Sequence, residues 1–362
     1  MDRGYIYVNK NNLQHNIEYL NNFTSKELCI VVKANAYGHG IDWTVRTAIE
    51  SGINWFAVAA LDEAILVRNL SDDIRILLLS EPSTTELEKI ATYNIDVTVY
   101  SEKFIDAMII SKDSYKIHLK IDTGMHRVGC SPENFDNLYD KITSSNNLSL
   151  EGICTHFPVA DTDKKQTTAS IQMFKSTISK INVDQLRIHA DNSASNTYNN
   201  DQVFNMARVG LATYGYTISP VKALDELKPV MEIKTRISNI QNRKKGEAVS
   251  YGKAHILEQD SLIATAPIGY GDGYPWNSFP DGKVIVKNNF CKLIGRVTMD
   301  QILFDVTGLD VNIDDEVIIL GSSSDNSLSI TIRDIAAWNK TIEWEILTNI
   351  KDNRLNRVEI DI

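Results

Sequence analysis

Short runs of β-branched and apolar residues recur between residues 28 and 216, and turn residues or segments with helical spacing separate them. Between these runs, apolar residues recur at intervals of three and four, which predicts helices over 84–93, 132–142 and 168–181. Eight strand-and-helix units favour a (β/α)8 TIM barrel, although a doubly wound sheet produces the same local pattern. The eight predicted strands are 29–34, 55–60, 74–79, 96–100, 116–121, 150–156, 185–190 and 207–214.

The pattern changes after about residue 222, where strand-like segments follow one another without intervening helices. A single helix is predicted near the end, over 331–340. This pattern is typical of a mainly antiparallel β domain. We therefore expect a barrel over 1–221 and a β domain over 222–362, with the N-terminal strand able to pack against the second domain. The segments behind this prediction are 229–240, 261–271, 282–289, 292–308 and 315–321.

Composition narrows the class of protein. The chain has 362 residues, of which 43% are hydrophobic and 23% charged, and no window approaches the roughly 18 apolar residues of a membrane span. The first residues lack the apolar core of a secretory signal and resemble the start of a domain. That domain could be part of a longer protein. A net charge of −10 argues against a nucleic-acid partner. The four scattered cysteines predict reduced thiols in a cytoplasmic protein, with no metal site.

The first candidate for chemistry is Lys33, which stands at the carboxyl end of a predicted strand and is followed at once by a turn containing glycine. The end of a barrel strand is where catalytic groups are commonly mounted. Removing a lysine from water lowers its pKa and makes the amine competent to form a Schiff base. A lysine that merely extends from a strand end into water is the alternative, and spacing alone does not exclude it.

The segment VVKANAYGHG (31–40) resembles the lysine segment of the alanine racemase family, whose members use pyridoxal 5′-phosphate (PLP). The resemblance continues in order through both predicted domains and covers nearly the whole chain. The further matching segments are KIDTGMHRVG (120–129), CTHFPVADTD (154–163), HADNSASN (189–196), ARVGLATYG (207–215), VSYGKAH (249–255), IGYGDGYP (268–275), GRVTMDQ (295–301) and RLNR (354–357).

The resemblance implies that Lys33 is covalently linked to the cofactor and that Tyr251 reaches the opposite face of the cofactor from the partner subunit. Racemisation removes the Cα proton on one side and returns a proton on the other, so two bases on opposite sides are needed. Lys33 would serve one enantiomer and Tyr251 the other. The family assignment also implies a homodimer with shared active sites and a small amino-acid substrate.

Further cofactor contacts follow from the same resemblance. Arg208 matches the arginine that faces the pyridine nitrogen, and a guanidinium, which stays protonated, discourages that nitrogen from gaining a proton of its own. The ring is then a weaker electron sink, which favours racemisation over transamination. His156 matches the histidine that supports this arginine. The cofactor phosphate is expected to bind Tyr37, Ser193 and the backbone amides of Gly210 and Leu211.

The resemblance also extends to residues that contact the substrate in the family. Arg127 corresponds to the arginine near the substrate carboxylate, which a planar guanidinium can bind in two places. Lys120 corresponds to a lysine that is carbamylated in many family members, and an unmodified, salt-bridged lysine is the alternative. Tyr270 and Met299 match residues that the other subunit brings to the entrance of the site.

One position departs from the family. A tyrosine that narrows the pocket usually precedes the arginine-rich tail motif, and here Asn353 takes its place, or Asp352 if the lengths differ by one residue. A shorter side chain that can hydrogen-bond a hydroxyl favours serine as a substrate. The departure resembles the catalytic domain of the membrane-anchored serine racemases of glycopeptide (vancomycin) resistance. We therefore expect a serine and alanine racemase that supplies D-amino acids for peptidoglycan, with an ordinary alanine racemase as the alternative.

The sequence is compatible with two other functions. A PLP-binding carrier protein on the same barrel would lack the β domain and its tyrosine, so the segments from 249 to 301 argue against it. A decarboxylase of related fold would be expected to place an acidic residue where Arg208 stands.

Overall fold

The computed structural model describes residues 3–190, 204–217 and 224–361. These divide into two compact units, one of residues 12–36 and 40–228 and the other of residues 1–11, 37–39 and 229–362. The division at 228/229 lies seven residues beyond the boundary expected from the sequence. We call them the barrel unit and the β unit and describe each by itself.

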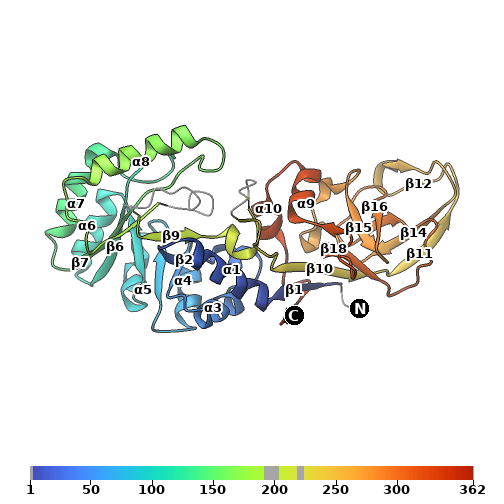
Figure 1. Ribbon diagram of the computed structural model, residues 1–362, viewed down its shortest axis with the longest axis horizontal. Coiled ribbons are helices and arrows are strands. Elements are labelled where there is room, and N and C mark those ends of the chain that lie inside the picture. Colours follow the sequence, from blue (N-terminus) through green and yellow to red (C-terminus); the bar gives the residue numbers. More distant parts are fainter. Residues whose placement is uncertain (1–2, 191–203, 218–223, 362) are drawn as a thin grey trace. The chain divides into compact units, whose positions relative to one another are not determined.

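The barrel unit is a closed parallel barrel of eight strands, in which the last strand pairs with the first. Six helices, α3 to α8, alternate with the strands along the chain (Figure 1). This confirms the barrel and excludes the doubly wound sheet. The strands are β2 (Glu27–Val31), β3 (Trp55–Val58), β4 (Arg75–Leu78), β5 (Asp96–Val99), β6 (Tyr115–Lys120), β7 (Leu148–Cys154), β8 (Arg187–His189) and β9 (Met206–Val209).

The helices bury one apolar face each. In α7, buried Phe135, Leu138 and Ile142 recur at the spacing of one helix face, whereas the intervening positions are polar. Ser101 and Asp163 begin α6 and α8 by accepting hydrogen bonds from backbone amides of the first turn. The helices are α1 (Lys10–Phe23), α3 (Ile41–Glu50), α4 (Leu61–Arg68), α5 (Leu87–Thr92), α6 (Glu102–Ser111), α7 (Phe135–Thr143) and α8 (Lys164–Ile178).

Two predicted barrel strands run three or more residues past the observed ends. The last one was expected over 207–214, but β9 ends at Val209 and Leu211–Tyr214 form a 3₁₀ turn (η4) closed by the Thr213 amide on the Gly210 carbonyl, 2.9 Å. The first was expected over 29–34, but β2 ends at Val31 because the backbone turns left-handed from Ala34 onward. Both errors fall at the carboxyl end of a barrel strand, where the chain leaves regular geometry.

The β unit contains a seven-stranded sheet, a three-stranded sheet and a two-stranded ribbon. The N-terminal strand β1 pairs antiparallel with β10 and parallel with the C-terminal β20, so both ends of the chain belong to one sheet. The strands are β1 (Tyr5–Asn9), β10 (Met231–Arg236), β11 (Asn239–Arg243), β12 (Ala248–Val249), β13 (His255–Ile256), β14 (Ser261–Ala266), β15 (Lys283–Val286), β16 (Asn289–Lys292), β17 (Ile302–Asp305), β18 (Glu316–Ser322), β19 (Ser329–Ile330) and β20 (Asn356–Ile360). The predicted helix is α9 (Ile332–Asn339), and a second, α10 (Glu343–Asn349), was not expected.

A buried carboxylate joins the two ends of the chain within the β unit. Asp272 has no exposed side-chain surface and accepts two hydrogen bonds from Arg3, 2.8 and 2.7 Å, while Arg354 lies 3.1 Å away. Arg354 also donates to the carboxylate of Asp300, 2.5 Å. These ion pairs hold the tail motif and the turn that contains Tyr270 in one arrangement.

Two expectations from composition can be compared with the structure. All four cysteines are free and buried. Among the described residues, no helix has both the length and the apolar character needed to cross a membrane.

Candidate active site

Lys33 lies two residues beyond the end of β2, at the start of a strained turn (α2, Lys33–Tyr37). Residues 34–37 all have φ between 52° and 54°, a conformation that costs non-glycine residues roughly 1–2 kcal/mol each. A run of this kind persists only where its surroundings enforce it, and such strain is concentrated at functional sites.

Glu63 anchors this turn, and sequence reasoning missed it. One carboxylate oxygen accepts from the amide of Ala34, 2.6 Å, and the other accepts from the amides of Ala59 and Ala60, 3.0 and 3.1 Å. The carboxylate therefore ties the turn after Lys33 to the turn that follows the neighbouring strand β3. No signal in the sequence singled it out, because an acid in the first turn of a helix is common on helices without any function.

The amine of Lys33 is shifted toward its neutral form. Burial lowers the pKa of Lys33, and the positive charges of Arg127 and Arg208 lower it further, whereas Glu63 acts in the opposite direction. A neutral amine is the nucleophilic form that attacks an aldehyde. The local electrostatics therefore suit Lys33 to Schiff-base chemistry.

Arg208, near the end of β9, is buried and held by acceptors. Its guanidinium donates to the carbonyls of Thr155, His189 and Ala190 at 2.9, 3.0 and 3.3 Å, and to Nδ1 of His189. Since arginine has no acceptor atom, these contacts fix both the position of the cation and the direction of every hydrogen bond. The guanidinium is thus pinned at the carboxyl end of the barrel.

His156 is half-buried just past the end of β7. Burial and the positive charges of Arg208, Lys120, Arg127 and Lys33 lower the pKa of His156 to about 3. The imidazole is therefore neutral at physiological pH. It can accept a hydrogen bond from a neighbouring cation but does not add a positive charge of its own.

Lys120 is the last residue of β6 and is buried. Burial lowers the pKa of Lys120, as do Arg208 and Arg127, while Cys154 and Asp122 act in the opposite direction. Arg127 follows in the loop after β6 and is exposed. Its charge acts on Lys33, Lys120 and His156, so the structure groups these side chains around one end of the barrel.

Gly210 and Leu211 are buried and link β9 to the η4 turn. They therefore lie two and three residues after Arg208, where backbone amides can face an anion at the barrel end. Ser193 lies outside the described residues.

The remaining candidates belong to the β unit. Tyr251, Tyr270 and Met299 are all exposed, with 73%, 44% and 52% of their surfaces accessible. Tyr251 begins a 3₁₀ turn (η6, Tyr251–Lys253), and the amides of Tyr270 and Gly271 bond to the carbonyls of Thr298 and Met299, 3.0 and 2.9 Å. The Tyr270 and Met299 turns are therefore fixed to each other.

The last two candidates in this unit differ in exposure. Tyr37 is buried, which raises the pKa of its phenol to about 12. Asn353 lies exposed in the turn that precedes Arg354.

Comparisons with known proteins identify the family. The family described as "Alanine racemase, N-terminal domain" matches residues 8–218, and "Alanine racemase, C-terminal domain" matches residues 230–359. The chain belongs to the alanine racemase family. It is 37% identical to an alanine racemase of Treponema denticola over 98% of this chain and 97% of that protein, and 34% identical to alanine racemase 1 of Clostridium acetobutylicum over 98% and 94%.

Solved structures agree with the family assignment. The crystal structure of alanine racemase from E. faecalis matches with a TM-score of 0.93 and 28% identity, covering 99% of this chain and 98% of the other. A histidine racemase from Leuconostoc mesenteroides matches with a TM-score of 0.90 and 26% identity over 99% and 98%. Members of the family depend on PLP.

The barrel unit fits this cofactor chemically. An amine with a lowered pKa stands at the carboxyl end of the barrel, and a buried guanidinium is held by carbonyl oxygens in the same region. The first suits the aldehyde of PLP and the second its pyridine nitrogen. The backbone turn after Arg208 offers a position for the phosphate.

The lowered pKa of His156 predicts a dependence of stability on pH. Below pH 6.5 an unfolded histidine binds a proton that folded His156 binds only near pH 3, so acidification destabilises the protein. At roughly 1.4 kcal/mol per pH unit, His156 accounts for up to about 2 kcal/mol of the stability lost between pH 7 and pH 5. We predict that the free energy of unfolding of His156→Gln falls by about 2 kcal/mol less than that of the unmodified protein between pH 7 and pH 5. Urea denaturation at both pH values measures the difference.

His126→Gln, which replaces an exposed histidine, is the control for this comparison and should lose as much stability as the unmodified protein. If His156→Gln and the unmodified protein lose the same free energy of unfolding, the imidazole of His156 does not have the lowered pKa assigned to it.

Proposed function

We propose that this chain interconverts the L and D enantiomers of alanine and also accepts serine, with Lys33 and Tyr251 as the two opposed bases. The observation that carries the proposal is the amine of Lys33, whose pKa burial lowers and whose neighbours Arg127 and Arg208 carry positive charge. The relatives reported above, which are named alanine racemases, support alanine as a substrate.

Each base handles the proton from one side of the substrate. When bound, PLP withdraws electrons from the Cα–H bond. Lys33 Nζ takes or returns the proton on one face, and the Tyr251 phenolic oxygen does so on the other. Arg127 binds the substrate carboxylate, and Arg208 holds its donors toward the pyridine nitrogen, which keeps that nitrogen without a proton of its own. A lone base that stayed in place would return the proton to the face it came from.

The other proposed contacts complete the pocket. Tyr37, Ser193, Gly210 and Leu211 bind the phosphate, and His156 supports Arg208. The lowered pKa of Lys120 favours the neutral amine, which is the form that reacts with carbon dioxide. This supports a carbamylated Lys120 that holds Arg127 by its negative charge.

A homodimer completes each site. Tyr251, Tyr270 and Met299 present exposed apolar surface on fixed turns of the β unit, a common feature of residues that enter a partner. In a dimer with two-fold symmetry, each β unit can deliver these residues to the barrel of the neighbouring chain. A carrier protein would not need residues that complete a partner's active site, which argues against that function. Arg208 takes the position where a decarboxylase of related fold is expected to have an acidic residue, which argues against decarboxylation.

Asn353 supports serine as an additional substrate. Asp352, the other candidate for the family's tyrosine position, is engaged by Arg357 at 3.1 Å. Arg357 also donates to the carbonyl of Gly38, 3.2 Å, in the segment that follows the Lys33 turn.

The fold accommodates more than one substrate, because a similar structure carries the name histidine racemase. The likeness to serine racemases of glycopeptide resistance rests on Asn353 alone. D-alanine and D-serine would both serve as components of peptidoglycan precursors.

The shared site is tested by mixing two inactive variants. Lys33→Ala and Tyr251→Phe should each racemise alanine poorly, because each lacks one base in every site. After subunit exchange of an equal mixture, about a quarter of the wild-type rate should return, since half of the dimers are hybrids and each hybrid holds one intact site. The measurement is chiral analysis of L-alanine after incubation.

Each variant incubated alone under the same exchange conditions is the control. If the mixture stays inactive although mass spectrometry demonstrates hybrid dimers, the two bases come from one chain.

Substrate preference is tested at position 353. A serine hydroxyl left without a partner in the pocket costs about 1–3 kcal/mol, or one to two orders of magnitude in selectivity. Asn353→Tyr should therefore lower the serine-to-alanine ratio of kcat/KM by roughly 10- to 100-fold, mainly by slowing serine. Initial rates with both L-amino acids provide the ratio.

Asp352→Asn is the matched control and should leave the ratio unchanged, because that side chain is engaged by Arg357. A ratio that changes with Asp352→Asn but not with Asn353→Tyr would move the specificity position to 352.

A further inference from the structure

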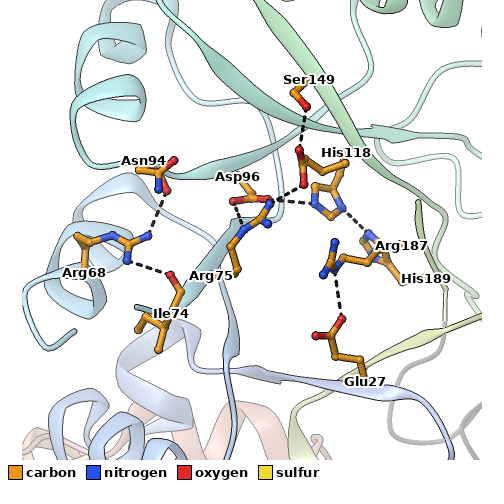
Figure 2. Close-up of polar contacts among 11 residues, drawn as sticks. Glu27, Arg68, Ile74, Arg75, Asn94, Asp96, His118, Ser149, Arg187 and His189 are labelled. Atoms are coloured by element: carbon orange, nitrogen blue, oxygen red, sulfur yellow. Dashed lines mark hydrogen bonds and ion pairs between the residues drawn. The ribbon is translucent and has the colours of Figure 1, made fainter. Parts of the chain in front are cut away.

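A line of hydrogen-bonded side chains runs through the barrel interior behind Arg208. His189 on β8 bonds to Arg208 through Nδ1, and its Nε2 lies 2.7 Å from Nδ1 of His118 on β6. Nε2 of His118 lies 3.4 Å from the carboxylate of Asp96, the first residue of β5. Figure 2 shows His118 between Asp96 and His189. Asp96, His118 and His189 have no exposed surface.

The chemistry of the Arg208 end fixes every proton in this line. Arginine only donates, so Nδ1 of His189 must carry a lone pair. The neutral ring then has its proton on Nε2, which donates to Nδ1 of His118. His118 in turn has its proton on Nε2, which points toward Asp96. Burial lowers the pKa of His189 well below its ordinary value, and so does the charge of Arg208, in agreement with a neutral ring.

The Asp96 end fixes the same direction independently. Burial alone would raise the pKa of Asp96, but hydrogen bonds from His118 and Arg75 outweigh it and keep the pKa low. Arg75 binds both carboxylate oxygens, one of them at 3.1 Å. The ionised carboxylate only accepts. A donor-only cation and an acceptor-only anion therefore enclose the two imidazoles.

Close packing surrounds the ring of His118. A Cβ on Gly152 would lie 2.5 Å from Nδ1 of His118, so glycine at that position is what admits the ring. On another side, Trp55 meets the ring of His118 edge-on at 5.7 Å, and the guanidinium of Arg75 lies over Trp55 at 4.6 Å. The line is held by close packing as well as by its hydrogen bonds.

We propose that His118 and Asp96 are positioning residues that fix the Nε2–H form of His189 and thereby hold Arg208 in its working orientation. This rests on the proposed function, in which Arg208 faces the pyridine nitrogen of the cofactor. With the opposite tautomer, His189 would direct an N–H at an N–H of Arg208, and the repulsion would displace the guanidinium. The negative charge of Asp96 polarises the two neutral rings, and this strengthens the hydrogen bond from Arg208 to Nδ1 of His189.

The test follows histidine ¹⁵N signals of the purified holoenzyme at pH 7.5. In the wild type, His118 and His189 should both carry their proton on Nε2. His118→Phe keeps an aromatic ring but removes the acceptor for His189, so His189 should protonate at Nδ1 in a share of molecules. PLP affinity, measured by equilibrium dialysis, should fall about tenfold because Arg208 moves.

Two further variants separate positioning from packing. His118→Asn places an amide oxygen near the position of Nδ1 and should restore the His189 tautomer and most of the PLP affinity. Glu151→Gln removes the other carboxylate bound to Arg75, at 3.0 Å, without touching either histidine, and should match the wild type in both readouts.

The proposal is overturned if wild-type His189 is protonated at Nδ1 or at both nitrogens. It is also overturned if His118→Phe keeps the wild-type tautomer and affinity, or if Glu151→Gln disturbs them as much as His118→Phe does. The tautomers are measured without substrate, so this test does not depend on racemase activity. If the wild type does not racemise alanine, the proposed function fails, whereas the tautomer measurement still decides the role of His118 and Asp96.

Discussion

The buried guanidinium of Arg208 is a fixed positive charge that acts on basic side chains at the barrel end. As a cation with donors only, it can be buried only where acceptors surround it, and carbonyls of Thr155, His189 and Ala190 provide them. Burial lowers the pKa of Lys33, Lys120 and His156, and the charge of Arg208 lowers each of them further. Burial and this fixed cation together shift its basic neighbours toward their neutral forms, which are the forms that accept protons or attack carbonyl carbon.

The second constraint is the strained turn after Lys33. Four consecutive non-glycine residues adopt left-handed geometry, and Glu63 binds the first amide of that run at 2.6 Å. The strain is unfavourable by itself, so it must be offset by contacts of this kind. The turn fixes where the chain leaves the barrel and therefore where Lys33 stands relative to β2.

Regular repetition made the fold predictable, and irregular geometry limited the prediction. The eight strands follow from β-branched runs, because a strand in a closed parallel barrel is buried on both faces. The expected strand over 207–214 failed after Val209, because the apolar residues Leu211, Ala212 and Tyr214 are buried in a 3₁₀ turn, and burial alone does not distinguish a turn from a strand. Helix α10 was missed because its seven residues are too few for a periodic signal.

Some residues of the candidate site could be predicted from the sequence, and others could be found only in the structure. Lys33 was singled out from its position at a strand end, whereas the roles of Tyr251, Arg208 and Asn353 came from the family resemblance. Glu63, His118 and Asp96 gave no sequence signal, because their significance lies in contacts between residues 22 to 71 positions apart. Such contacts depend on the tertiary fold and leave no local pattern.

Racemisation at this site requires that the amine of Lys33 carries the cofactor. The most direct measurement is borohydride reduction of the purified, PLP-loaded protein, followed by digestion and mass spectrometry of the labelled peptide. We expect a yellow protein whose reduced cofactor is attached to Lys33 within VVKANAYGHG. A label on Lys120 or any other lysine, or no covalent label at all, would contradict it.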